Sequence, residues 1–199
     1  MELSLNQSSF ILQSAIAPPD PVSPEQWKLM RKFAVQYPGD PAILSPLYLN
    51  LFTLEPGQAI FVPAGVLHAY ISGFGVELMA GSDNVLRGGL TPKHIDIPEL
   101  INILDFNSLS PQIICPPPSA SLFRYPAPCR EFSLSLMCGG GKEIFPENGP
   151  AICIVTEGEL RAGGTLFKKG ESFFVPCEKR DSVPLSFDGN YSLFAAAGN

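Results

Sequence analysis

Two stretches of the chain share one pattern, "LEPGQAIFVPAGVLHAY" at residues 54–70 and "FKKGESFFVPCEKRDSV" at residues 167–183. Gly57 aligns with Gly170, and the same Phe-Val-Pro triplet follows each glycine at the same distance. In both copies a turn glycine, a short apolar strand and a terminating proline follow one another. The repeat therefore predicts two related β units, one in each half of the chain.

The two copies differ at the position where a metal ligand is expected. Five residues after the shared proline, the first copy has His68 and the second has Asp181. If this position faces the interior of the unit, only the first copy offers an imidazole to a metal ion. A lone histidine in an apolar strand is more often structural, so the pattern by itself leaves both interpretations open.

The remaining sequence favours short strands joined by turns, with few helices. The chain has 199 residues, 21 prolines, 18 glycines and 45% hydrophobic residues, which is typical of a folded protein with many turns. In the first half of the chain, Pro or Gly separates short apolar runs. These runs predict strands at residues 47–54, 58–63, 67–72 and 75–80. Residues 82–93 have the composition of a loop, and residues 107–118 that of an extended connector ending in three prolines. We therefore expect two domains, 1–106 and 107–199, the second made of strands and turns throughout.

Two helices carry recognisable start signals. Ser23 is the expected N-cap of the first, Pro24 occupies its first turn, and Gln26 completes a capping box. A Tyr-Pro-Gly sequence at residues 37–39 ends this helix. Its expected apolar positions are Trp27, Met30 and Ala34. A second, short helix is predicted at residues 95–104, with Asp96 near its start.

Charge and composition exclude several kinds of partner. The net charge is −6 and no cluster of Lys or Arg occurs, so nucleic acid and anionic membranes are not expected partners. No apolar run has the length of a membrane span, and no signal peptide is predicted. The five cysteines form no C-x-x-C pair and sit among apolar neighbours, which favours buried free thiols. We expect a cytoplasmic location.

The segment around His68 resembles a known family. The pattern G-x5-P-x-G-x2-H from Gly57 to His68 is similar to a metal-binding motif of the cupins, which are small jelly-roll barrels. The following stretch, "HAYISGFGVELMAGSDNVLRGGLTPKHIDIPEL" at residues 68–100, resembles the signature region of type I mannose-6-phosphate isomerases. These are zinc-dependent cupin enzymes that interconvert mannose 6-phosphate and fructose 6-phosphate. The resemblance implies a mainly β fold of cupin-like jelly-roll barrels with a few short helices.

The resemblance implies roles for five residues. His68 is the implied zinc ligand, and Tyr70 and Glu77 are implied to line the sugar pocket. Arg87 is implied to act at the reacting end of the substrate, and Lys93 to hold the sugar phosphate. These roles fit the chemistry, because proton transfer between two sugar carbons develops negative charge that a guanidinium stabilises. Without the resemblance, the two cations would be ordinary loop charges, and Tyr70 a packing residue.

The implied zinc site is incomplete in this sequence. A catalytic zinc needs about three protein ligands, and the family takes others from a Q-x-H segment and a glutamate, whereas no glutamine here is followed two places later by histidine. The sequence thus resembles the C-terminal half of the enzyme: an incomplete catalytic barrel followed by a metal-free barrel. Strands 47–54 and 58–62 are then expected to expose unpaired edges and apolar faces.

We therefore expect the chain alone to be a poor or inactive isomerase. Three origins stay open: a truncated product, a fragment, or one part of a split enzyme that an N-terminal half completes. Two alternatives stay open: a non-catalytic cupin that binds a sugar or serves as a scaffold, and a different sugar-phosphate isomerase or epimerase.

Overall fold

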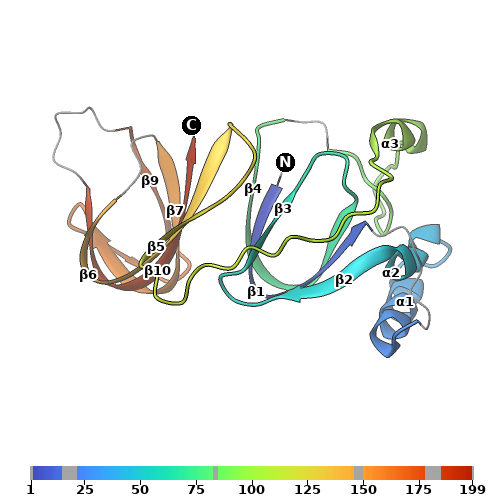
Figure 1. Ribbon diagram of the computed structural model, residues 1–199, viewed down its shortest axis with the longest axis horizontal. Helices are drawn as coiled ribbons and strands as arrows, with labels where there is room; N and C mark the ends of the chain where they lie inside the picture. Colours follow the sequence, from blue (N-terminus) through green and yellow to red (C-terminus); the bar gives the residue numbers. More distant parts are fainter. Residues whose placement is uncertain (1, 15–21, 83–84, 146–149, 178–184, 199) are drawn as a thin grey trace. The chain divides into compact units, whose positions relative to one another are not determined.

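The structure, a computed structural model, is mainly β and divides into two compact units (Figure 1). It describes residues 2–14, 22–82, 85–145, 150–177 and 185–198, and of 2–14 and 142–143 only the backbone. Unit 1 comprises Met1–Glu77 and Gly81–Ile113, and unit 2 comprises Leu78–Ala80 and Ile114–Asn199. The change of unit after Ile113 falls inside the extended connector, a little beyond the boundary expected at residue 106.

Unit 1 is a four-stranded antiparallel sheet in which one strand has three partners. Its strands are β1 (Glu2–Ser14), β2 (Leu49–Leu54), β3 (Ala59–Val62) and β4 (His68–Met79). β1 pairs with β2 through residues 9–14 and with β3 through residues 2–5, and β4 also pairs with β1.

This sheet answers part of the expectation of unpaired strand edges in unit 1. β1 pairs with one edge of β2 and one edge of β3, and both of these are end strands of the described order. The sequence pattern assigned no element to the segment before the first helix, where β1 lies and bonds to both β2 and β3. The apolar faces are also covered, because Leu54, Ile60, Val62 and Val66 form a buried cluster against which Phe52 and Leu109 pack.

Side chains cap the starts of most helices of unit 1. These helices are α1 (Pro24–Gln36), the 3-10 helix η1 (Pro41–Leu44), α2 (Ser45–Tyr48) and α3 (Ile97–Ile103). The capping box of α1 is confirmed, because Ser23 Oγ accepts the Gln26 amide hydrogen at 3.2 Å and Gln26 Oε1 accepts that of Ser23 at 2.8 Å. Asp96 caps α3 by accepting a hydrogen bond from the Glu99 amide.

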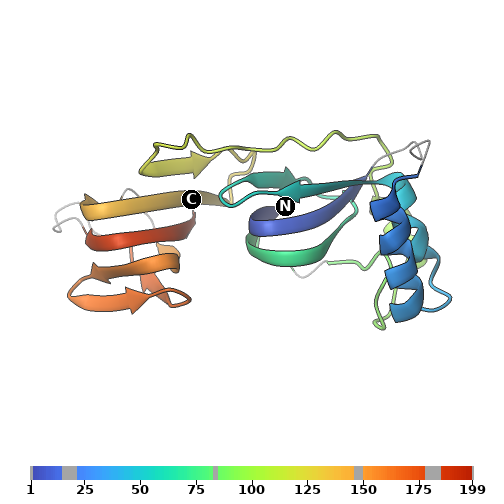
Figure 2. The ribbon, with the colours of Figure 1, turned by 90° about the horizontal axis from the view of Figure 1, so that it is seen from below.

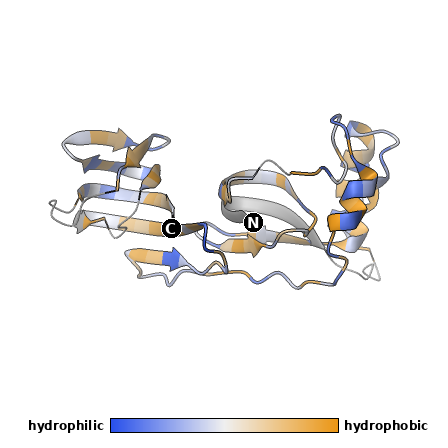
Figure 3. Cartoon of the chain, turned by 90° about the horizontal axis from the view of Figure 1, so that it is seen from above, coloured by the Kyte–Doolittle hydropathy of each residue, from blue (hydrophilic) through white to orange (hydrophobic). Residues whose placement is uncertain are grey.

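The buried face of α1 differs from the predicted one. Leu29 and Phe33 are buried, one helical turn apart, whereas Trp27 is 49% exposed. Figure 3 shows hydrophobic and hydrophilic segments alternating along this helix. Leu29, Phe33 and Leu49 form a cluster that Ile43, Leu51, Ile71 and Leu90 extend. This cluster fixes α1 against the sheet of unit 1 and against the loop after β4.

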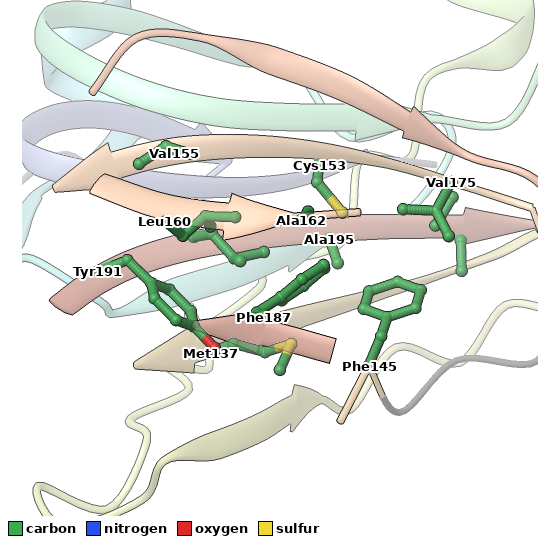
Figure 4. Packing of buried hydrophobic residues seen from close by; sticks show 13 residues of the cluster. Met137, Phe145, Cys153, Val155, Leu160, Ala162, Val175, Phe187, Tyr191 and Ala195 are labelled. Carbon is green, nitrogen blue, oxygen red and sulfur yellow. The ribbon is translucent and has the colours of Figure 1, made fainter. Parts of the chain in front are cut away.

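Unit 2 is a six-stranded antiparallel sheet. Its strands can be followed in Figures 1 and 2. The strands are β5 (Leu122–Tyr125), β6 (Phe132–Ile144), β7 (Ala151–Ala162), β8 (Thr165–Lys168), β9 (Ser172–Val175) and β10 (Ser186–Gly198). Their order is β5-β6-β10-β7-β8, with β9 also paired to β7. The core lies around Phe187, whose ring meets those of Phe145 and Tyr191 (Figure 4). The Phe173 ring also meets it, edge-on.

The turns of the two repeat copies have matching geometry. Gly57 and Gly170 have φ of 85° and 87°, and both turns close with a backbone hydrogen bond of 2.9 Å, from Gln58 to Glu55 and from Glu171 to Lys168. In each copy the side chain of the fourth turn residue accepts a hydrogen bond from the backbone N–H of the first. A shared turn before β3 and β9 confirms this part of the predicted repeat. Asp181 lies outside the described residues.

Three further expectations meet different outcomes. The runs at 67–72 and 75–80 form one continuous strand, β4. Within this strand Gly73 has a φ of 118°. All five cysteines are thiols outside any disulfide, but Cys153 is the one that is buried, so the expectation of buried thiols is wrong for the others. Among the described residues, no helix has the length and apolar character needed to cross a membrane.

Candidate functional site

The turn before His68 is seated against the end of α3. Gly65 has a φ of 79°, and a Cβ added there would lie 2.7 Å from the Ile103 carbonyl oxygen. The Asp105 amide donates to the Gly65 carbonyl oxygen at 2.9 Å. Only glycine fits both the positive φ and the close approach. The glycine of the P-x-G-x2-H pattern therefore fixes where β4, and with it His68, begins.

The His68 ring has a defined orientation. Its Nδ1 lies 2.9 Å from the Val66 carbonyl oxygen. A carbonyl oxygen can only accept, so Nδ1 carries a proton, and in the neutral ring Nε2 carries the lone pair. This is the arrangement that second-shell hydrogen bonds impose on metal-binding histidines. The ring of Tyr70, two residues along the same strand face, meets the His68 ring edge-on, with centroids 6.4 Å apart.

His68 and Tyr70 line a cavity of about 350 Å³ within unit 1. Its walls come from α1, from the segment 42–49, from the start of β4 and from the loop 88–90. This volume is at the lower end of small-molecule sites. The structure thus brings two of the five predicted site residues into one cavity.

The loop that carries Arg87 packs beside His68. A Cβ added to Gly88 would lie 2.3 Å from Leu67 Cδ1, so the backbone of Gly88 lies directly against the residue before His68. Gly88 and its two successors line the cavity. Arg87 itself is exposed and does not line the cavity. The predicted loop is present over its described residues, 85–93.

Glu77 and Lys93 lie outside the cavity wall. Glu77 follows His68 by nine residues on β4, a path of about 30 Å along an extended strand. Lys93 is exposed, and its amide donates to Thr91 Oγ1 at 3.2 Å. His94 is also exposed in this loop. The roles of Glu77 and Lys93 stay predictions.

The described residues do not complete a zinc site. Among them, no group of three or more His, Cys, Asp or Glu side chains is placed to hold a metal ion. His68 has the orientation of a ligand, but one imidazole cannot provide the three protein ligands of a catalytic zinc. The donor set described here does not fit zinc by itself.

Sequence reasoning missed the helical side of the cavity. Lys32, Gln36, Ser45 and Tyr48 line it, and Ser45 Oγ is buried without a hydrogen-bond partner among the described residues. Partial burial raises the pKa of the Tyr48 hydroxyl, and the nearby Asp40 carboxylate raises it further. No local pattern marks these residues, because only the packing of α1 and α2 against β4 places them at the cavity.

The comparisons with known proteins agree on one relationship. The chain is 38% identical over 190 residues to mannose-6-phosphate isomerase of Escherichia coli, covering 92% of this chain and 47% of that protein. It is 32% identical over 184 residues to the Bos taurus enzyme, covering 85% and 44%. The crystal structure of the Salmonella typhimurium enzyme, with substrate (fructose 6-phosphate) and zinc bound, has a TM-score of 0.84 at 26% identity; the match covers 100% of this chain and 66% of that one. No protein-family model matches the chain.

Solved variants of the Salmonella typhimurium enzyme include alanine replacements of a histidine, a glutamate and an arginine. In that chain the glutamate follows the histidine by nine residues, and the arginine follows the glutamate by ten. This chain has the same spacing: Glu77 follows His68 by nine residues, and Arg87 follows Glu77 by ten.

The antiparallel β units, with a P-x-G-x2-H turn and a histidine on the cavity wall, match the cupin fold of the solved mannose-6-phosphate isomerase. Within the cupin class, the chain is a homologue of the mannose-6-phosphate isomerases. It spans about half the length of the curated relatives that it matches.

Proposed function

We propose that the chain forms part of a zinc-dependent mannose-6-phosphate isomerase, which interconverts mannose 6-phosphate and fructose 6-phosphate. The observation that carries the proposal is the contact of Gly88 with Leu67, which holds the Arg87 loop beside His68. The matched spacing of His68, Glu77 and Arg87 to three positions replaced in a relative supports it.

The proposed chemistry requires charge stabilisation at two ends of the substrate. Moving a proton between C1 and C2 of a sugar develops negative charge on the sugar oxygens, and the Arg87 guanidinium is proposed to stabilise it. Lys93 is proposed to hold the phosphate as a point charge. Tyr70 and Glu77 are proposed to contact the sugar itself.

The proposed zinc site is shared with residues outside the described part of the chain. His68 supplies one ligand, with Nε2 toward the metal, and the remaining ligands come from an N-terminal half of the enzyme. Zinc, when bound there, supplies Lewis-acid polarisation of the sugar oxygens. Residues 1–106 are then the incomplete catalytic cupin and residues 107–199 a metal-free cupin-like domain. A cytoplasmic location is part of the same proposal.

One observation favours a second candidate, a non-catalytic cupin that binds a sugar or serves as a scaffold. The described residues contain no three-donor group for a metal, and the cavity beside His68 is nevertheless lined by hydroxyl, amide and ammonium groups that suit a polyol. This candidate predicts sugar binding without turnover.

Turnover measured with and without an added N-terminal half distinguishes the two candidates. The chain is assayed with mannose 6-phosphate and zinc, alone and after addition of the N-terminal part of the Salmonella typhimurium relative. We expect no turnover from the chain alone and turnover from the complemented pair.

The variant His68→Ala should abolish turnover of the pair. His94→Ala is the matched control, since it removes the chain's other histidine from an exposed loop. Sugar binding without turnover in the pair would support the scaffold candidate, and turnover by the chain alone would contradict the incomplete site.

A further inference from the structure

Asp40 joins two segments that lie fifty residues apart in the sequence. Its Oδ1 accepts a hydrogen bond from the Ala42 amide at 2.8 Å, where it caps the 3-10 helix η1. Its Oδ2 accepts a hydrogen bond from the Leu90 amide at 2.7 Å. One carboxylate thus uses both oxygens to hold the helical segment against the loop after Arg87.

The loop at this point has a backbone conformation that needs support. Leu90 has a φ of 51°, the one positive value among the described non-glycine residues. Such a conformation is disfavoured for a side chain with a Cβ and persists where surrounding contacts enforce it. Two contacts do so here: the Asp40 carboxylate holds the Leu90 amide, and the Leu90 side chain packs on the cluster of Leu29, Phe33 and Leu49.

The neighbouring glycines leave the loop little freedom to move. A Cβ added to Gly89 would lie 2.3 Å from Ala42 Cβ and 3.4 Å from Asp40 Oδ1. Gly88 rests on Leu67, the residue before His68. The segment 88–90 is therefore held at Leu67 on one side and at Asp40 on the other, and Arg87 leads directly into it.

We propose that Asp40 is a positioning residue, which fixes the loop 88–90 and thereby sets the direction of the Arg87 side chain relative to His68. The proposal rests on the proposed function, in which Arg87 contacts the substrate and Asp40 does not. A carboxylate is required at this position because two N–H groups point at its two oxygens. An asparagine offers one acceptor oxygen and turns an NH₂ group toward the other N–H.

The loop contact is tested in the full chain, without any need for turnover. Asp40→Asn keeps the size of the side chain and removes one acceptor; Asp96→Asn, at the N-cap of α3, is the matched control. We expect the Leu90 amide to exchange at least tenfold faster in Asp40→Asn, and the Arg87 Nε–H resonance, assigned by Arg87→Lys, to shift. Asp96→Asn should leave both signals in place. An unchanged Leu90 exchange rate or an unmoved Arg87 resonance in Asp40→Asn would overturn the proposal.

A double-mutant cycle in the complemented pair separates positioning from general stability. Asp40→Asn should lower kcat at least tenfold with little change in KM, but should have no further effect when Arg87 is already alanine. An equal loss in both backgrounds would show that Asp40 acts on the fold alone. If Arg87→Ala leaves turnover unchanged, the proposed role of Arg87 fails instead, while the loop contact is judged by the exchange data.

Discussion

Gly89→Ala should destabilise unit 1 by about 2–6 kcal/mol, because two costs add at this position. Gly89 has a φ of 133°, a conformation that costs another residue about 1–3 kcal/mol. The added methyl group would also lie 2.3 Å from Ala42 Cβ, and overpacking of this kind costs about 1–3 kcal/mol. The two costs sum to about 2–6 kcal/mol, and at a urea dependence of about 1.5 kcal/mol/M a loss of about 3 kcal/mol lowers the unfolding midpoint by about 2 M.

Two other glycines of unit 1 separate the two costs. Gly39 has a φ of 85° and no described atom within 4 Å of an added Cβ, so Gly39→Ala should show only backbone strain, about 1–2 kcal/mol. A Cβ added to Gly81 would also have no described atom within 4 Å, and Gly81 has no positive φ. Gly81→Ala should therefore leave the free energy of unfolding nearly unchanged. Removing the clashing methyl group with Ala42→Gly should recover the overpacking cost in the Gly89→Ala background.

Trp27 makes the assay specific, because it is the one tryptophan of the chain and lies on α1 of unit 1. Urea unfolding followed by its fluorescence therefore reports on the unit that contains the cavity. The reasoning is refuted if Gly89→Ala costs no more than Gly39→Ala, or if Ala42→Gly recovers nothing.

Three further substitutions test the packing and the capping. Ser23→Ala removes the cap of α1 and should cost about 1 kcal/mol by the same fluorescence assay; no loss would contradict the capping box. Phe187→Ala in the core of unit 2 should cost about 3–5 kcal/mol, measured by circular dichroism during thermal unfolding, and a loss below 1 kcal/mol would contradict the described core. Gly139→Val should also destabilise unit 2, since a Cβ there would meet the Tyr191 ring at 2.4 Å, whereas Gly140→Val meets open space and should cost less.

The sequence predicted the elements that local chemistry determines. The capping box at Ser23, the cap at Asp96 and the turns at Gly57 and Gly170 each depend on residues three or four positions apart, and all four are present. Such signals are reliable because the hydrogen bonds that satisfy them form within the same short segment.

The errors concern features that depend on distant segments. The face that α1 buries is set by the sheet and by Leu90, so Leu29 and Phe33 replace the predicted positions. The strand β1 exists through its pairing with β2 and β3, which no local pattern in residues 2–14 indicated.

The candidate site divides in the same way. His68 and Tyr70 were predicted from the motif and the family resemblance. The cavity that they line was not predicted, because half of its lining residues lie in the segment 32–49. Asp40 gave no signal as a site residue, since its second oxygen meets an amide fifty residues away. Position in space, not residue type, makes these residues part of the site.

The zinc content of the complemented pair tests the central claim most directly. If the Nε2 of His68 is a ligand of a shared zinc ion, the purified pair should hold about one zinc per complex, His94→Ala should hold the same, and His68→Ala should lose most of it. Equal zinc in His68→Ala and the unaltered pair would contradict the account.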